Sequence, residues 1–257
     1  MSSNQFPWVS HHGMTSEQYQ SYFNQYIGQG YGLAWVSGYS LNGDDRYAAV
    51  WYNDNGPQFV AHHRMTSSQY QSYFDQYVSQ GYRLIEVSGY AFGNEANYAA
   101  LWQRAPGADW VAHHGMTSEQ YQSYFDLYIS QGYVLKQVDG YTVNRVDYYA
   151  AIWTKDTVPA FVAHHRMTSS QYQSYFDQYV GQGYRLVDVS GYTVDGVANY
   201  AALWYKDNGP AFVARHGLDA QQYQAAFDDY VNQGYRLTVV DGYEVGGVDY
   251  YAAIWTK

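Results

Sequence analysis

The stretch W-V-S-H-H-G-M-T-S-E-Q-Y at residues 8–19 decides the fold, because close variants of it return four more times along the chain. These variants begin at Phe59, Trp110, Phe161 and Phe212, each 51 residues after the one before. A fixed period of this length is the signature of a repeat architecture. We therefore interpret residues 1–257 as a single domain of five copies: 6–56, 57–107, 108–158, 159–209 and 210–257.

Each copy is predicted to fold as strand A, a helix, strand B and strand C. Thr15 and Gln18 have the spacing of a capping box, and Gly30 is a typical residue just beyond a helix end, which predicts a helix over residues 16–29. The helical period places four apolar residues on one face, which we expect to be buried: Tyr19, Phe23, Tyr26 and Ile27.

The strands carry equally clear patterns. Strand A covers residues 8–12, and strand B covers Tyr31–Tyr39, where the step from Leu33 to Val36 breaks the two-residue period and predicts a bulge near residues 34–35. Strand C, Tyr47–Trp51, is apolar on both faces. That pattern predicts a central strand with Trp51 and its equivalents in the core.

The ends of the chain suggest how the copies are joined. Copy one starts with a strand A that no B–C pair precedes, and copy five ends with a B–C pair that no strand A follows. We expect sheets of the form B–C–A′, in which A′ belongs to the next copy, and closure by pairing residues 8–12 with residues 250–255. The predicted fold is an α+β repeat protein: a closed five-fold propeller-like toroid of three-stranded antiparallel sheets, each with one helix. An open solenoid with modified end copies is the alternative.

Composition excludes several classes of function. The chain has 13 Lys and Arg against 23 Asp and Glu, a net charge of −10, which argues against binding the phosphate backbone of nucleic acids. With no cysteine there is no disulfide framework and no thiolate zinc site. No apolar run is long enough to insert into a membrane, and residues 1–7 lack the features of a signal peptide, so we expect a cytoplasmic protein or leaderless secretion.

A pair of histidines ends strand A in four copies, with Arg215-His216 in its place in copy five, and this is the sharpest polar signature. Successive residues of a strand point to opposite faces, so the two members must have different surroundings. Either they fix the corner between strand and helix, or at least one of them binds a ligand; metal binding is the weakest alternative, and we expect neither a metal nor a cofactor. The candidate ligand-binding positions are His11, His12, His62, His63, His113, His114, His164, His165, Arg215 and His216.

Aromatic and turn residues supply further candidates. Trp8 and Trp110 start their strands and could rim a shallow pocket, where a ring would stack on the C–H face of a sugar. Polar partners, or simple turn formers, lie before strand C: Asp45, Asn97, Asp147, Asn199 and Asp249. Tyr22 and its equivalents Tyr73, Tyr124 and Tyr175 are rings that core packing is not expected to use.

The copies also alternate. Copies two and four carry Arg64 and Arg166 where copies one, three and five carry glycine. This alternation indicates duplication of a two-copy unit or a consensus design. Motifs of serine hydrolases, zinc peptidases and nucleotide-binding loops are missing from the sequence, and repetition multiplies binding sites more readily than active sites.

The recurring pattern H-H-G/R-M-T-S-x-Q-Y and the element Y-A-A-I-W resemble the tandem-repeat modules found beside β-lactamase-like serine hydrolases, including fungal polyglycine hydrolases. The resemblance covers essentially the whole chain and implies a non-catalytic accessory module. The hydrolase domain and its Ser-x-x-Lys nucleophile have no counterpart in this sequence.

Our leading hypothesis is a multivalent, lectin-like protein that binds glycans or glycoproteins as a monomeric ring, with one shallow site in each copy. The alternatives are a non-catalytic scaffold for protein interaction or substrate docking, and a structural or engineered repeat protein. We do not expect an enzyme.

Overall fold

A computed structural model describes residues 6–157 and 160–257, which form five helices and fifteen strands. Copy one contains β1 (Trp8–Met14), α1 (Ser16–Gly28), β2 (Gly32–Leu41) and β3 (Asp44–Tyr52). Copies two and three contain β4 (Phe59–Thr66), α2 (Ser67–Ser79), β5 (Arg83–Phe92), β6 (Glu95–Gln103), β7 (Trp110–Met116), α3 (Ser118–Ser130), β8 (Val134–Val143) and β9 (Val146–Thr154). Copies four and five contain β10 (Phe161–Thr168), α4 (Ser169–Gly181), β11 (Arg185–Val194), β12 (Val197–Tyr205), β13 (Phe212–Asp219), α5 (Ala220–Asn232), β14 (Arg236–Val245) and β15 (Val248–Thr256).

Every copy builds its own three-stranded antiparallel sheet in the order A–C–B, as in β1–β3–β2. Trp8 pairs with Tyr52 and Gly32 pairs with the same residue from the other side, so strand C is central, as predicted. The predicted exchange of strand A between copies is wrong, and so is the predicted pairing of residues 8–12 with residues 250–255. Strands A and B are parallel and joined by the helix, which makes each copy a β-α-β unit split by strand C. The helix packs on the sheet that contains its own strand A.

The helices begin as the sequence predicts. The Thr15 side chain accepts the Gln18 N–H while the Gln18 side chain accepts the Thr15 N–H, and the same box opens the other four helices. Tyr19 and Tyr26 are buried against strand C. The prediction for Ile27 is wrong: its side chain is 36% exposed, because it lies at the edge of the face that meets the sheet.

Strand B carries the predicted bulge, since its register against strand C shifts between Leu33 and Trp35. The same shift recurs in the other copies. The strand C tryptophans, Trp51 and its equivalents, have no exposed surface and anchor the five cores, as predicted.

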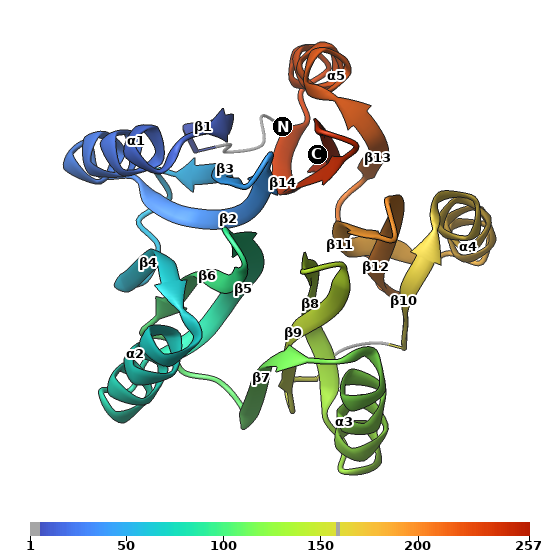
Figure 1. Ribbon diagram of the computed structural model, residues 1–257, viewed down its shortest axis with the longest axis horizontal. Coiled ribbons are helices and arrows are strands. Elements are labelled where there is room, and N and C mark those ends of the chain that lie inside the picture. The colour runs from blue at the N-terminus through green and yellow to red at the C-terminus, as the bar shows by residue number, and fades with distance from the viewer. Residues whose placement is uncertain (1–5, 158–159) are drawn as a thin grey trace.

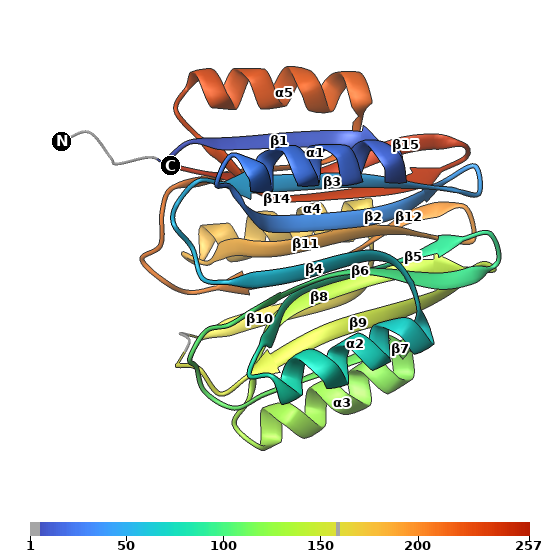
Figure 2. The same cartoon turned by 90° about the vertical axis from the view of Figure 1, so that its left-hand side faces the viewer.

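The copies are set around a common centre, with the B strands innermost and the helices outside (Figure 1). Each B strand contacts the B strands of its two neighbours, and β14 of the last copy contacts β2 of the first. Seen from the side, the hairpin turns between strands B and C lie at one face of the assembly, and the segments that link the copies lie at the other (Figure 2).

Within residues 6–157 and 160–257 no helix is long and apolar enough to cross a membrane. The expectation of no signal peptide rests on the first residues of the chain, most of which lie outside the described part.

Candidate functional site

The first histidine of each pair packs on the helix of its own copy. The His11 ring stacks on Tyr22 with 3.9 Å between ring centres, and its Nε2 lies 2.7 Å from the Tyr26 hydroxyl. His62, His113 and His164 make the same two contacts. Tyr22 and its three equivalents are therefore used in packing. In copy five the Arg215 guanidinium takes this place, 5.3 Å from the centre of the Tyr230 ring.

The second histidine joins neighbouring copies. Nε2 of His63 lies 2.9 Å from Oγ of Ser16, the first residue of the preceding helix. His114, His165 and His216 make the same bond to Ser67, Ser118 and Ser169. His12 faces copy five, where Ala220 replaces the serine, and its ring packs edge-on against Tyr223 and Tyr251. Burial lowers the pKa of both His63 and His114 to about 4.

Trp8 and Trp110 also pack across the boundary between copies. Each meets a phenylalanine of the preceding helix edge-on, Phe227 for Trp8 and Phe74 for Trp110, at 5.7 and 5.6 Å between ring centres. Trp110 in addition lines a surface crevice.

The predicted turn residues fall into two groups. Asn97 and Asn199 are buried and donate to the carbonyl groups of Glu95 and Val197, two residues earlier, which is a turn-forming role. They occupy the place of Arg46, one residue beyond the aspartate position.

The aspartates explain the alternation of the copies. Asp45 accepts a hydrogen bond from the Tyr47 hydroxyl at 2.8 Å and faces Nε of Arg64, from the next copy, at 3.2 Å. Asp147 repeats this arrangement with Tyr149 and Arg166. Copies two and four have Ala96 and Ala198 at the aspartate position, and the glycines Gly115 and Gly217 follow them. Where a copy has aspartate at the position of Asp45, the next copy thus has arginine at the position of Arg64. Where it has alanine, the next copy has glycine.

The boundary between copies five and one breaks this rule. Asp249 accepts from the Tyr251 hydroxyl at 2.7 Å, but the residue opposite is Gly13, whose added Cβ would lie 3.6 Å from that hydroxyl. The backbone is left-handed at this position in every copy, with φ of 64° at Gly13 and 54° at Arg64. Arg64 tolerates this strained conformation because its guanidinium is held by Asp45 and by the Phe92 ring, whose centre lies 4.0 Å away.

Two crevices open at the face that carries the linking segments. One, of about 510 Å³, lies between copies one and two and is lined by Tyr31, Tyr52, Phe59, Asp54, Asn55, Gln58 and Gln103 together with Gly32. The other, of about 530 Å³, lies between copies two and three and includes Tyr82, Arg83, Asp109, Trp110 and Tyr133. Each combines aromatic rings with carboxylate, amide or guanidinium groups.

In copy four an arginine–aspartate pair occupies the place that is open in copy one. In copy four Arg185 stands at the place of Gly32 and forms two hydrogen bonds with Asp207, at 2.9 and 2.6 Å. Its guanidinium lies against Gly209 of the linking segment. Copy one has the equivalent aspartate, Asp54, but no side chain at residue 32 to reach it.

Two more hollows lie at the opposite face, beside the starts of α2 and α4. They are lined by equivalent residues that include Ser67 and His114 in one, and Ser169 and His216 in the other. Both lie at boundaries with the alanine–glycine combination, where the space of the arginine side chain is vacant.

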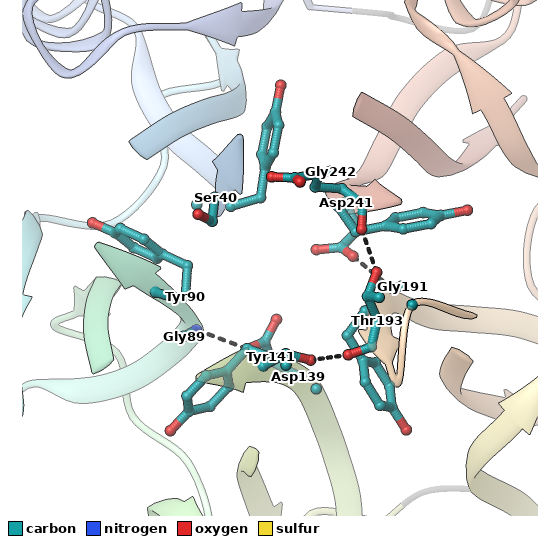
Figure 3. Close-up of a pocket in the computed structure, with 18 of the residues that line it drawn as sticks. Ser40, Gly89, Tyr90, Asp139, Tyr141, Gly191, Thr193, Asp241 and Gly242 are labelled. Carbon is teal, nitrogen blue, oxygen red and sulfur yellow. Dashed lines mark hydrogen bonds between the residues drawn. The ribbon is translucent and has the colours of Figure 1, made fainter. Parts of the chain in front are cut away.

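A further cavity, of about 310 Å³, lies where the five B strands converge (Figure 3). It is lined by the Gly-Tyr pair that recurs in all five B strands, together with Asp139 and Asp241. The rings of Tyr90 and Tyr141 point away from the centre (Figure 3). The serine or aspartate of each copy accepts the glycine N–H of the preceding copy: Gly38 to Ser88, Gly89 to Asp139, Gly140 to Ser190, Gly191 to Asp241 and Gly242 to Ser37.

Sequence reasoning missed both the linking-segment crevices, apart from Trp110, and the central cavity. The linking segments differ in composition between copies, so the repeat pattern does not highlight them. The Ser/Asp-Gly-Tyr element is visible in every copy and was the available signal for the centre. Among the described residues no three His, Asp or Glu side chains are grouped as metal ligands.

Comparison with known families adds one finding. A family model described as a polyglycine hydrolase-like structural repeat matches residues 7–54, 56–105, 107–156, 158–207 and 209–257. These five matches account for nearly the whole sequence, one for each copy defined by the 51-residue period. The chain therefore belongs to the family of polyglycine hydrolase-like structural repeats.

Proposed function

We propose that this chain is a non-catalytic, multivalent carbohydrate-binding protein whose main sites are the crevices between copies at the linking-segment face. The observation that supports this best is the lining of the crevice between copies one and two. Tyr31, Tyr52 and Phe59 are partly exposed there, beside the exposed side chains of Asp54 and Gln58. Aromatic faces stack on sugar C–H groups, while carboxylate and amide groups bind the hydroxyls.

The proposed sugar sites lie in the crevices and not at the histidine pairs. Their contacts with tyrosine and serine hydroxyls give them a sufficient structural role, and two of them have strongly lowered pKa values. The crevices also differ in their lining. Arg185 pairs with Asp207 at the boundary between copies four and five, whereas Arg83 of copy two has Ala105 at that aspartate position and lines an open crevice. We therefore expect about two strong sites rather than five. Two sites on one rigid body still raise avidity on a clustered glycan by roughly 10²-fold or more where the geometry permits.

The serine–histidine pairs between copies are poorly suited to catalysis. Ser16 and His63 lie at the distance of a nucleophile and its base. However, a base with a pKa of about 4 is weak at neutral pH, and the described residues provide no hydrogen bond from Nδ1 of His63 to an orienting carboxylate. The pair is better suited to joining two copies.

A glycan array followed by calorimetry tests the carbohydrate proposal. Gly32→Arg should copy the arginine–aspartate pair of copy four by pairing with Asp54, and it should remove the site between copies one and two. Gly32→Ala is the control, because its Cβ would lie 3.5 Å from the Phe59 ring and 3.9 Å from the Tyr52 carbonyl oxygen, which are ordinary contacts. Binding that survives Gly32→Arg unchanged, or a folded protein that binds no glycan, would contradict the proposal.

We also infer that the five copies form a closed monomeric ring rather than an open solenoid. The supporting contacts are those between copies five and one: Ser37 donates to Asp241 at 2.9 Å, and the Trp35 indole donates to the Val240 carbonyl at 2.9 Å. In a closed ring, Ser37→Ala and Ser88→Ala should lower the melting temperature by similar amounts. In an open solenoid Ser37 would lie at a free end, and Ser37→Ala would have little effect.

The family suggests a second candidate, a scaffold that docks a glycine-rich substrate for a hydrolase. Calorimetry with a polyglycine peptide distinguishes the two proposals. Micromolar peptide binding together with a negative glycan array would favour docking, and the reverse result would favour the carbohydrate proposal.

A further inference from the structure

Four carboxylates are buried around the centre of the molecule. Asp139 and Asp241 belong to the ring of glycine N–H acceptors. Glu86 and Asp188 lie two residues before the acceptor serines of their own strands, Ser88 and Ser190. None of the four is more than 5% exposed. The corresponding positions in other copies carry Ser37, Ser88 and Ser190, or Trp35, Gln137 and Val239, so this fold does not require carboxylates there.

The hydrogen-bond donors to these carboxylates are all neutral groups. None of the ion pairs of the described residues includes them. Peptide N–H groups donate to Asp139, Asp188 and Asp241. The Ser190 and Ser37 hydroxyls donate to Asp139 and Asp241, and the Gln137 amide donates to Oε1 of Glu86. Oε2 of Glu86 has no hydrogen-bond partner, although this side chain is only 2% exposed and its charge interacts with those of the three aspartates. Burying such charges without an opposite charge is costly, so a cation or protons must neutralise them.

The central cavity gives a cation room beside two of these groups. Asp139 and Asp241 line it, together with backbone of the five glycines and the threonines Thr142 and Thr193 (Figure 3). Its volume of about 310 Å³ corresponds to roughly ten water molecules, which is far larger than a bare metal ion. The lack of a three-ligand metal group among the described residues also favours a larger cation.

We propose that the central cavity binds a small organic diamine, with its ammonium groups facing the carboxylates of Asp139 and Asp241. An ammonium group has three N–H donors and no acceptor, which matches a cavity lined by carboxylate, hydroxyl and carbonyl oxygens. Glu86 does not line the cavity, but its charge interacts with those of Asp139 and Asp241 and adds to the negative potential there. Burial raises the pKa of all four carboxyl groups, which is the expected response of the site without its cation.

The test uses 1,4-diaminobutane with the whole protein at pH 8, followed by calorimetry and thermal unfolding. The wild-type chain should bind one diamine and melt at a higher temperature in its presence. Asp139→Ser combined with Asp241→Ser should weaken binding at least tenfold. It should still fold, because copies one, two and four already use serine as the acceptor at this position. Glu86→Gln, which introduces the residue that copy three has, should weaken binding about threefold or more.

Asp44→Ser combined with Glu95→Ser is the matched control, since it removes two exposed charges near the same face and should leave diamine binding unchanged. Equal binding by the Asp139/Asp241 variant, or no binding by the wild type, would overturn the proposal. Stabilisation by Ca²⁺ but not by the diamine would overturn the choice of ligand. The cavity and the linking-segment crevices lie at opposite ends of the B strands, so this test is independent of glycan binding.

Discussion

The paired alternation between copies predicts that two substitutions, each harmful alone, are tolerated together. Asp45→Ala would leave Arg64 in a left-handed conformation without its carboxylate. Arg64→Gly would leave the largely buried Asp45 without a cation. The double variant recreates the Ala96–Gly115 boundary that the chain already uses between copies two and three. The double variant should therefore be more stable than the sum of the single changes predicts.

The magnitudes follow from the geometry of the pair. The ion pair spans 3.2 Å, with the Asp45 side chain 7% exposed and the Arg64 side chain 39% exposed, so solvent screens part of it. An unpaired buried carboxylate costs about 1–3 kcal/mol, and a left-handed non-glycine residue costs roughly 1 kcal/mol or more. We expect each single variant to lose about 1–2 kcal/mol and the coupling energy to be about 1–2 kcal/mol. For a chain of 257 residues, 1 kcal/mol corresponds to roughly 2 °C in melting temperature.

Thermal and denaturant unfolding of the four proteins of this cycle measure the coupling. Asp44→Ala is the control, because Asp44 and Arg46 lie 4.0 Å apart and the Asp44 side chain is 72% exposed. This change should cost less than about 0.5 kcal/mol. Additivity of the two single effects within about 0.5 kcal/mol would refute the reasoning, since it would mean that the pair does not determine the alternation.

Gly13→Arg should raise the melting temperature by about 1–3 °C in a thermal scan, because it gives Asp249 the arginine that the other two aspartates have. Gly38→Ala should cost about 1–3 kcal/mol in denaturant unfolding, because its Cβ would lie 2.4 Å from a tyrosine ring of the next copy, whereas Gly28→Ala, with nothing within 4 Å, should not. Burial raises the pKa of Asp188 to about 7 and that of Asp241 to about 8, so their contribution to stability is complete at low pH and is lost as the pH rises. This loss runs from the ordinary aspartate pKa of 3.8 up to about pH 8, whereas the histidines, whose pKa burial lowers from 6.5, oppose it below about pH 7. The melting temperature should therefore fall between pH 7 and 8, and a flat profile there would contradict the assignment.

Local structure could be predicted well from the sequence. The helix starts depend on Thr15 and Gln18, which are close in the chain, and the bulge depends on the spacing of Leu33 and Val36 within one strand. Both signals are short-range and occur in every copy. The central position of strand C followed from apolar residues on both of its faces.

The pairing of strands could not be read from the missing partners at the two ends. Strand A pairs within its own copy because the helix that follows it must cover the same sheet, and this coupling of strand, helix and strand was visible in the order of elements. The crevices could not be predicted from the sequence for another reason. The crevices depend on residues that differ between copies, such as Gly32 in copy one and Arg185 in copy four. A comparison of the copies highlights the residues that they share and not those that differ.

A two-copy alternation cannot be continued around an odd number of copies, and the chain shows where the mismatch falls. With five copies, aspartate occurs in copies one, three and five, while arginine occurs only in copies two and four. The boundary between copies five and one therefore joins Asp249 to Gly13, and it is the same boundary at which Ala220 replaces the serine that would bind the second histidine. Two polar links that other boundaries have are lost there together, while the links of the central ring, from Gly242 to Ser37 and from Ser37 to Asp241, are kept. Copy one compensates with other bonds to β14, since the Trp35 indole donates to the Val240 carbonyl, the Tyr52 hydroxyl to the Leu237 carbonyl and the Asn42 N–H to Glu244.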